Sequence, residues 1–120
     1  MNISKRTNPD FLNGVPELLL LKLLAGKPMY GYELVQRIKL QSEAALEFGE
    51  GCIYPILHRL ERDRLLSSRR GAVGGRSRVV YRLTPAGARK LQESVSAWQR
   101  VVQAVGRVLE GDWHVEPAHA

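Results

Sequence analysis

The sequence predicts a mostly α-helical fold with a small β-hairpin wing: a winged helix-turn-helix domain followed by a long C-terminal dimerisation helix. Three observations support this fold. Three helical segments precede a glycine-rich hairpin and a long final helix, basic charge is gathered in one part of the chain, and the final helix carries an apolar heptad pattern. With 120 residues, the chain fits one domain and one appended element. We expect a flexible arm at 1–14, the winged domain at 15–83, the dimerisation helix at 84–110 and a flexible tail at 111–120.

Three helices are predicted in the first half of the chain. The first is leucine-rich, runs from Val15 to about Ala25 and ends before Pro28, because proline disfavours helical geometry in the preceding residue. The second runs from about Tyr32 to Gln41, and the third from about Gly51 to Arg64. On a helical wheel, the third helix has an apolar side and a small-to-basic side. The apolar side contains Ile53, Ile56, Leu57 and Leu60, and the other side contains Gly51, Pro55, His58, Arg59 and Arg62.

A β-hairpin is predicted after the third helix. Its short strands lie at about 67–70 and 78–83, and the glycine-rich segment 71–76 reverses the chain between them. Thr84-Pro85 then starts a new helix, with threonine as N-cap and proline at the first helical position. The predicted order of elements is that of a winged helix with a C-terminal extension.

The last helix carries a heptad seam over nearly three repeats. A lone helix cannot hide such a stripe, so we expect it to form a dimer interface. Its residues are spaced by alternating intervals of four and three: Leu91, Val95, Trp98, Val102, Val105 and Leu109.

The basic charge is concentrated between residues 50 and 90. The chain has 18 Lys and Arg against 12 Asp and Glu, a net charge of +6. Residues 50–90 contain ten of the basic and three of the acidic residues, so this segment carries +7. Such a one-sided block is typical of proteins that bind a polyanion, here double-stranded DNA.

Membrane insertion and secretion are not expected. The longest apolar run, Val15 to Ala25, contains Glu17 and Lys22 and is too short to cross a bilayer. The first ten residues lack the apolar core of a secretory signal, so we expect a cytoplasmic protein.

The third helix is the candidate recognition helix, and the hairpin is the candidate wing. Arginines on the helix suit guanine edges or phosphates, and hairpin arginines suit phosphates and the adjacent minor groove. The alternatives are that the helix arginines are merely solvated and that the hairpin arginines cover the apolar base of the turn. The candidate DNA-binding residues are Tyr54, His58, Arg59, Arg62, Arg69, Arg70, Arg76 and Arg78.

Three segments in order resemble the PadR family of transcriptional regulators: Gly31-Tyr32-Glu33-Leu34, the stretch from Glu50 to Glu61, and the stretch from Tyr81 to Gly87. The resemblance implies a homodimeric repressor that binds a roughly palindromic operator and is released by a small molecule or another signal. It also implies that Tyr54 faces DNA. Arg64 stands where the family usually has glycine: it either costs about 1 kcal/mol in a left-handed backbone or adds a phosphate contact. Tyr30 stands where histidine is common.

Trp98 has two interpretations. It is either a large side chain of the dimer interface or, as the resemblance implies, one wall of a cavity between subunits that takes a planar aromatic or cationic effector. In the second case, Leu20 on the first helix is expected to supply another wall.

Redox, metal and catalytic functions are less favoured. Cys52 lies near the start of the third helix, where a redox switch is conceivable, although a small, partly buried side chain is the preferred interpretation. His58, His114 and His119 have no zinc-ligand spacing with Cys52, so we expect no metal and no cofactor. No catalytic triad or phosphate-binding loop is present, so we do not expect an enzyme. The competing function is a winged helix that binds an acidic protein partner.

Overall fold

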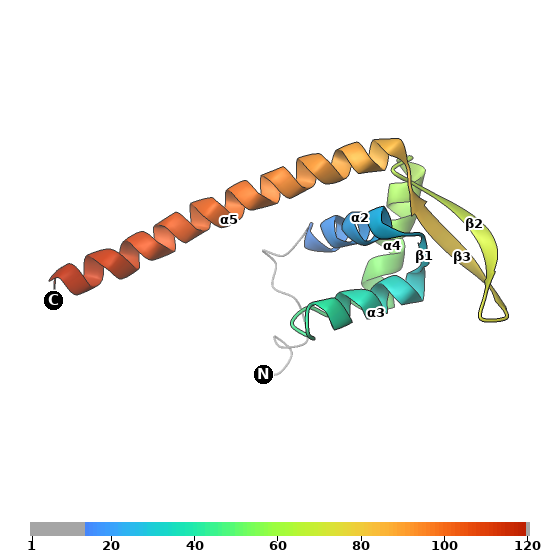
Figure 1. The fold of residues 1–120 in the computed structure, drawn as a ribbon, viewed down its shortest axis with the longest axis horizontal. Helices are drawn as coiled ribbons and strands as arrows, with labels where there is room; N and C mark the ends of the chain where they lie inside the picture. Colours follow the sequence, from blue (N-terminus) through green and yellow to red (C-terminus); the bar gives the residue numbers. More distant parts are fainter. Residues whose placement is uncertain (1–13, 120) are drawn as a thin grey trace.

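The computed structural model confirms the winged-helix fold with a long C-terminal helix (Figure 1). It describes residues 14–119 and the side chains of residues 14–111, so the arm expected at 1–14 lies outside the described residues except for Gly14. The elements in chain order are α2 (Val15–Gly26), β1 (Met29–Tyr30), α3 (Gly31–Gln41), α4 (Glu50–Arg62), β2 (Leu66–Val73), β3 (Arg76–Leu83) and α5 (Pro85–His119).

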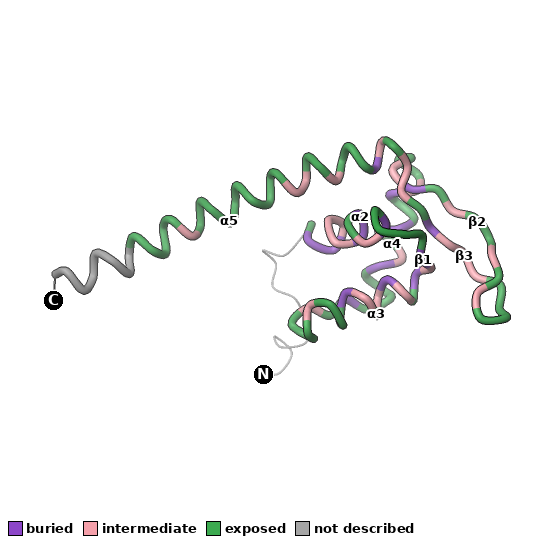
Figure 2. The backbone as a smooth tube through the Cα atoms, viewed as in Figure 1, coloured by how far each residue is buried: buried purple, intermediate pink, exposed green. Residues whose placement is uncertain are grey.

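The core lies where α2, α3 and α4 meet the base of the sheet (Figure 2). Burial of their apolar side chains supplies most of the stability of helices this short, because isolated helices of 11 to 13 residues are marginal in water. Phe48 adds a buried ring from the connector between α3 and α4. The buried apolar residues are Val15, Leu20, Leu21, Leu24, Met29, Leu34, Ile38, Phe48, Ile53, Leu57, Leu60, Leu66 and Tyr81.

The sheet is antiparallel with the strand order β1-β3-β2. The sequence predicted only the two hairpin strands; β1 has two residues, Met29 and Tyr30, which pair with Tyr81 and Val80. The hairpin arms are also longer than predicted, because the ladder continues to the pair Val73↔Arg76. Only Gly74 and Gly75 form the turn, with φ of 58° and 78°. Two successive positive φ values match the right-handed twist of the arms, and glycine adopts them without steric cost.

The joint between α4, β2 and α5 is held by Thr84. Its Oγ1 accepts a hydrogen bond from the Gly87 backbone N–H at 3.0 Å, which confirms the predicted N-cap. The Thr84 hydroxyl lies 2.8 Å from the carbonyl oxygen of Arg64 and 3.0 Å from that of Leu65, to either of which it can donate. Arg64 has a φ of 64°, which is a left-handed backbone conformation. This is the first of the two alternatives expected for Arg64. Thr84 therefore ties the end of α4 to the start of α5.

The long helix α5 extends well beyond the head (Figure 1). It has 35 residues, which at 1.5 Å per residue corresponds to about 52 Å. The radius of gyration is 17.6 Å, whereas a compact chain of this length has about 14 Å. The predicted end of this helix near residue 110 is wrong, because the helix continues to His119. One glycine such as Gly111 costs only about 1 kcal/mol in a helix interior, which is too little to end a helix of this length.

In the part of the chain that the structure describes, every helix is either too short or too polar to cross a bilayer.

Candidate nucleic-acid interface

Helix α4 separates a buried apolar side from an exposed side, as predicted. Ile53, Leu57 and Leu60 are fully buried against α2 and α3, which fixes the rotation of the helix. Pro55, His58 and Arg62 are exposed, and Tyr54 is half-buried at the boundary. Ile56, which was predicted on the apolar side, is also only half-buried. The exposed face of α4 therefore carries small side chains near the start of the helix and basic side chains towards its end.

Arg59, a predicted DNA-binding residue of α4, forms an ion pair within the protein. Its Nη2 lies 2.9 Å from Oε1 of Glu17 on α2, and they form an ion pair. The sequence offered two alternatives, a DNA contact or a solvated side chain, and the structure shows a third, a bond between two helices. Because a partly exposed pair of this kind contributes only about 0–1 kcal/mol, a phosphate that approaches Arg59 can compete with Glu17.

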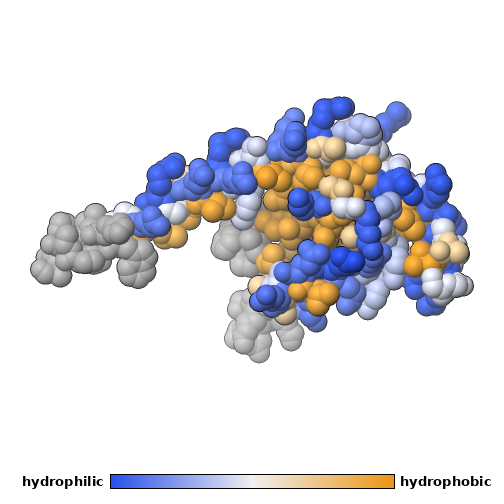
Figure 3. Space-filling view, in the orientation of Figure 1, coloured by the Kyte–Doolittle hydropathy of each residue, from blue (hydrophilic) through white to orange (hydrophobic). Residues whose placement is uncertain are grey.

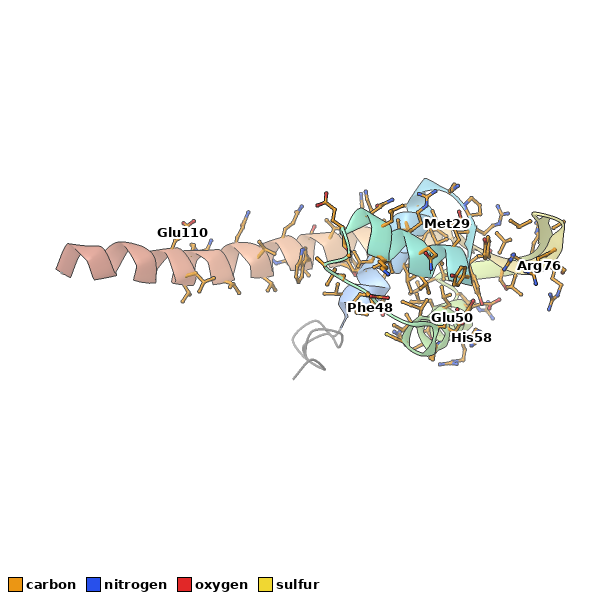
Figure 4. All side chains as sticks on the ribbon, turned by 90° about the horizontal axis from the view of Figure 1, so that it is seen from below. Met29, Phe48, Glu50, His58, Arg76 and Glu110 are labelled. Atoms are coloured by element: carbon orange, nitrogen blue, oxygen red, sulfur yellow. The ribbon has the colours of Figure 1, made fainter. Side chains whose placement is uncertain are left out.

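The register of the hairpin divides its arginines between two faces. Ser68↔Tyr81 and Arg70↔Val79 are neighbouring pairs, so Arg70 shares the face of the core residue Tyr81 and points to the α4 side. Arg69, Arg76 and Arg78 alternate to the opposite face, where Arg69 and Arg76 are exposed and Arg78 is half-buried. Figure 4 shows Arg76 at the far end of the hairpin, away from His58 on α4.

Arg78 occupies the open edge of β3 beyond the two-residue strand β1. Its Cζ lies 4.4 Å from the centroid of the Tyr30 ring, a cation–π stack. Its Nε is buried and has no hydrogen-bond acceptor among the residues that the structure describes. The stack fixes the guanidinium plane, which leaves its edge donors available to an in-plane acceptor.

Four of the predicted residues come together around one cleft of about 330 Å³ between α4 and the sheet: Tyr54, His58, Arg70 and Arg78. The rings of Tyr54 and His58 are 6.4 Å apart between centroids. Arg59, Arg62, Arg69 and Arg76 do not line this cleft. Its remaining walls are Tyr30, Gly31, Ser77, Val79 and Tyr81, none of which is among the predicted site residues.

Tyr54 is held in place by Gly31. A Cβ atom at Gly31 would overlap the Tyr54 ring, so only glycine lets α3 approach α4 this closely. Burial raises the pKa of the Tyr54 hydroxyl, nearby Glu50 raises it further, and Arg78 acts in the opposite direction. The phenol is therefore neutral at physiological pH and can donate a hydrogen bond.

Only the later part of the predicted dimer seam on α5 is exposed, because its first residues pack against the head. Leu91 was predicted to contact a second subunit, but it packs against the core of its own head, and Val95 is half-buried. Further along, α5 presents exposed apolar side chains over adjacent turns (Figure 3). They are Trp98, Val101, Val102, Val105, Val108 and Leu109, with exposed fractions of 41% to 66%.

An apolar groove of about 240 Å³ lies between α2 and α5. It is lined by Gly14, Val15, Leu18, Ser94, Ala97, Trp98 and Val101. The expectation that Leu20 forms a wall is wrong: Leu20 is fully buried in the core, and Leu18, two residues earlier, faces the groove. The apolar run of α2 has almost no polar side, so its sequence could not indicate which leucine faces outwards.

Cys52 is exposed in the first turns of α4, so the preferred interpretation of a partly buried side chain is wrong. Among the described residues, no group of three or more His, Cys, Asp or Glu side chains is arranged to hold a metal ion.

Comparisons with known proteins converge on one family. The sequence profile of the transcriptional regulator PadR-like family matches residues 20–93. A transcriptional regulator of Mycobacterium tuberculosis is 36% identical over 105 residues, which cover 88% of this chain and 92% of that protein. A protein of Lysinibacillus sphaericus is 30% identical over 103 residues, 85% of this chain and 94% of that one.

Solved structures agree with this result. A PadR-like transcriptional regulator from Bacillus cereus superimposes with a TM-score of 0.74 at 29% identity, covering 84% of this chain and 97% of that chain. A PadR family regulator from Eggerthella lenta superimposes with a TM-score of 0.72 at 32% identity, covering 84% of this chain and 87% of that chain.

Proposed function

The chain belongs to the PadR-like family of transcriptional regulators, and from this premise we propose that it binds a near-palindromic DNA operator as a homodimer, represses transcription there and is released by a small effector. Proteins of this family are transcriptional regulators and not enzymes.

The observation that carries the DNA-binding proposal is the convergence of α4 and the hairpin. His58 and Tyr54 from the helix meet Arg70 and Arg78 from the sheet around one cleft, while Arg62 lies exposed further along the helix. A recognition helix in the major groove with a basic wing on the adjacent backbone uses this combination of elements. Exposed Arg69 and Arg76 on the other side of the wing add phosphate or minor-groove contacts.

The exposed apolar face of α5 supports the homodimer. Its six large apolar residues are each 41% to 66% exposed, and they follow one another along a helix that extends beyond the head. Contiguous apolar surface of this kind is typical of interfaces, and a spacing of three and four residues is typical of helix pairing. Pairing two α5 helices also sets two α4 helices at a fixed separation, which a palindromic operator requires.

The groove between α2 and α5 supports release by an effector. One groove, at about 240 Å³, is smaller than the usual range of small-molecule sites, about 300–1,000 Å³, but two grooves that face each other in a dimer together reach it. The flat faces of two Trp98 side chains suit a planar aromatic guest. Leu18 of α2 lines the groove and Glu17 of α2 binds Arg59 of α4, so a shift of α2 on ligand binding is transmitted to the recognition helix.

Selection of bound duplexes from a random DNA pool tests the function. We expect enrichment of a sequence with two related half-sites about one helical turn, or a multiple of it, apart. Affinity should fall steeply with salt, because several arginines release counterions from phosphates. Repeating the selection with planar aromatic compounds present should reduce the yield for compounds that occupy the groove. A pool without enrichment at low salt would contradict the proposal and favour a protein partner for the basic face.

A further inference from the structure

The contact between α2 and α4 includes an ion pair that occupies an arginine on the exposed side of α4. The Nη2 atom of Arg59 lies 2.9 Å from Oε1 of Glu17, which is the distance of a charge-assisted hydrogen bond. The other two ion pairs of the described residues are longer, at 3.6 Å, and neither involves α4. Within this part of the chain, Arg59 is therefore the basic residue of α4 whose charge a carboxylate already compensates.

Glu17 keeps its place on α2 without help from Arg59. It is the third residue of that helix, after Val15 and Pro16, and the first turn of a helix favours a negative charge because its backbone N–H groups carry partial positive charge. Val15 and Pro16 are buried, so this turn is anchored to the core. Of the two paired side chains, Glu17 is 20% exposed and Arg59 is 44% exposed. When the pair opens, we therefore expect Arg59 to move and Glu17 to stay.

Arg59 lies beside two residues that the proposed function assigns to DNA. It follows His58 directly and precedes Arg62 by three residues, so Arg62 lies on the next turn of the same side of α4. All three side chains are exposed, and a polyanion that reaches His58 and Arg62 also comes within reach of Arg59. A phosphate at that point either replaces the Glu17 carboxylate or binds near it against like-charge repulsion. In both cases, Glu17 opposes binding of the polyanion.

We propose that Glu17 is an affinity-determining residue outside the DNA interface: its carboxylate competes with phosphate for Arg59 and thereby lowers the affinity of α4 for DNA. With the operator as the polyanion, the proposal rests on the proposed function above, whereas the competition itself requires only a polyanion that reaches α4. Val15 and Leu18, on either side of Glu17 in the sequence, line the apolar groove between α2 and α5. A molecule in that groove therefore contacts the turn of α2 that carries the competing carboxylate.

A purely structural role of the ion pair predicts the opposite sign. If the pair served only to hold α4 in the orientation that binds DNA, its loss would weaken binding. If Glu17 competes with phosphate, the loss of its charge strengthens binding. An exposed pair of this kind corresponds to about a two- to fivefold change in affinity per subunit, and thus to about four- to 25-fold for two subunits on one operator.

A double-mutant cycle measures the competition. Operator affinity is determined by fluorescence anisotropy at one salt concentration for the wild type, Glu17→Gln, Arg59→Gln and the variant with both changes. We expect Glu17→Gln to bind about four- to 25-fold more tightly than the wild type. In the Arg59→Gln background, the same change should alter affinity by less than about twofold, because no guanidinium is left to release. Glutamine keeps the shape of the side chain, and thermal denaturation followed by circular dichroism checks that the variants are folded.

Glu33→Gln is the matched control. The Glu33 side chain on α3 is 25% exposed and pairs with Lys27, not with α4. Its replacement changes the net charge by the same amount, so its effect on affinity should be equal in the presence and absence of Arg59. The proposal is overturned if Glu17→Gln binds more weakly than the wild type or equally well, or if its gain is as large in the Arg59→Gln background.

Binding to heparin, a sulfated polyanion, separates this proposal from the proposed function. On a heparin column, Glu17→Gln should elute at a higher salt concentration than the wild type, and the variant with both changes should elute with Arg59→Gln. If no operator can be selected but elution follows this order, the proposed function fails and the competition for Arg59 stands. If the wild type binds a selected operator but the cycle shows no coupling between Glu17 and Arg59, the competition is wrong and the proposed function stands.

Discussion

Replacing Val102 with lysine tests whether α5 pairs two subunits. Val102 is 49% exposed in the middle of the apolar face, between Trp98 at 41% and Val105 at 50%. It does not pack against the core of the head, so the substitution should leave the winged domain folded. In a dimer with two-fold symmetry, the same change occurs on both sides of the interface.

The size of the effect follows from the area that pairing would cover. Burying a whole valine side chain contributes about 1.5–3 kcal/mol, so the exposed half of Val102 contributes about 1 kcal/mol per subunit. Two copies lose about 2 kcal/mol, and partial desolvation of two like charges adds to this loss. The dissociation constant of the dimer should therefore rise at least roughly 30-fold.

Sedimentation velocity over a series of protein concentrations measures this shift. We expect the wild type to sediment as a dimer at concentrations where Val102→Lys is largely monomeric. Gln103→Lys is the matched control, because it adds the same charge to the neighbouring exposed position, away from the apolar face, and should leave the dimer intact. A Val102→Lys variant with unchanged dimer stability would refute the assignment of this face to dimerisation.

Three further substitutions test other parts of the account. Arg62→Ala should weaken operator binding by about 1–3 kcal/mol if Arg62 contacts a base, and unchanged affinity in a gel-shift titration would remove it from the interface. Arg64→Gly should raise the free energy of unfolding in urea by up to about 1 kcal/mol, because Arg64 has a φ of 64°; a less stable variant would show that this backbone is not strained. Gly87→Ala should lower that free energy by about 1–3 kcal/mol, because a Cβ atom there overlaps the carbonyl oxygen of Leu65; a melting temperature equal to that of the wild type would contradict this packing.

Most of the fold could be predicted because local signals and tertiary structure agree. The amphipathic pattern of α4, the Thr84-Pro85 helix start and the paired glycines of the turn each act within a few residues. Strand β1 could not be predicted from local sequence, since Met29 and Tyr30 are a strand only because β3 lies beside them. The extent of α5 could not be predicted from the glycine at position 111, because one glycine costs too little to end a helix of this length.

The sequence predicted several residues of the candidate site, but not how they are arranged in space. Charge and helix periodicity identified Tyr54, His58, Arg70 and Arg78, all of which line the cleft. The ion pair between Arg59 and Glu17 joins residues 42 positions apart, and no local pattern encodes it.

In the proposed complex, paired α5 helices set two copies of the basic face at a fixed distance. Hydroxyl-radical footprinting of the wild type on its selected operator tests this most directly. We expect two protected patches of equal extent, related by two-fold symmetry and separated by about one helical turn or a multiple of it. A single protected patch, or protection that Val102→Lys reproduces in full at the same protein concentration, would contradict it.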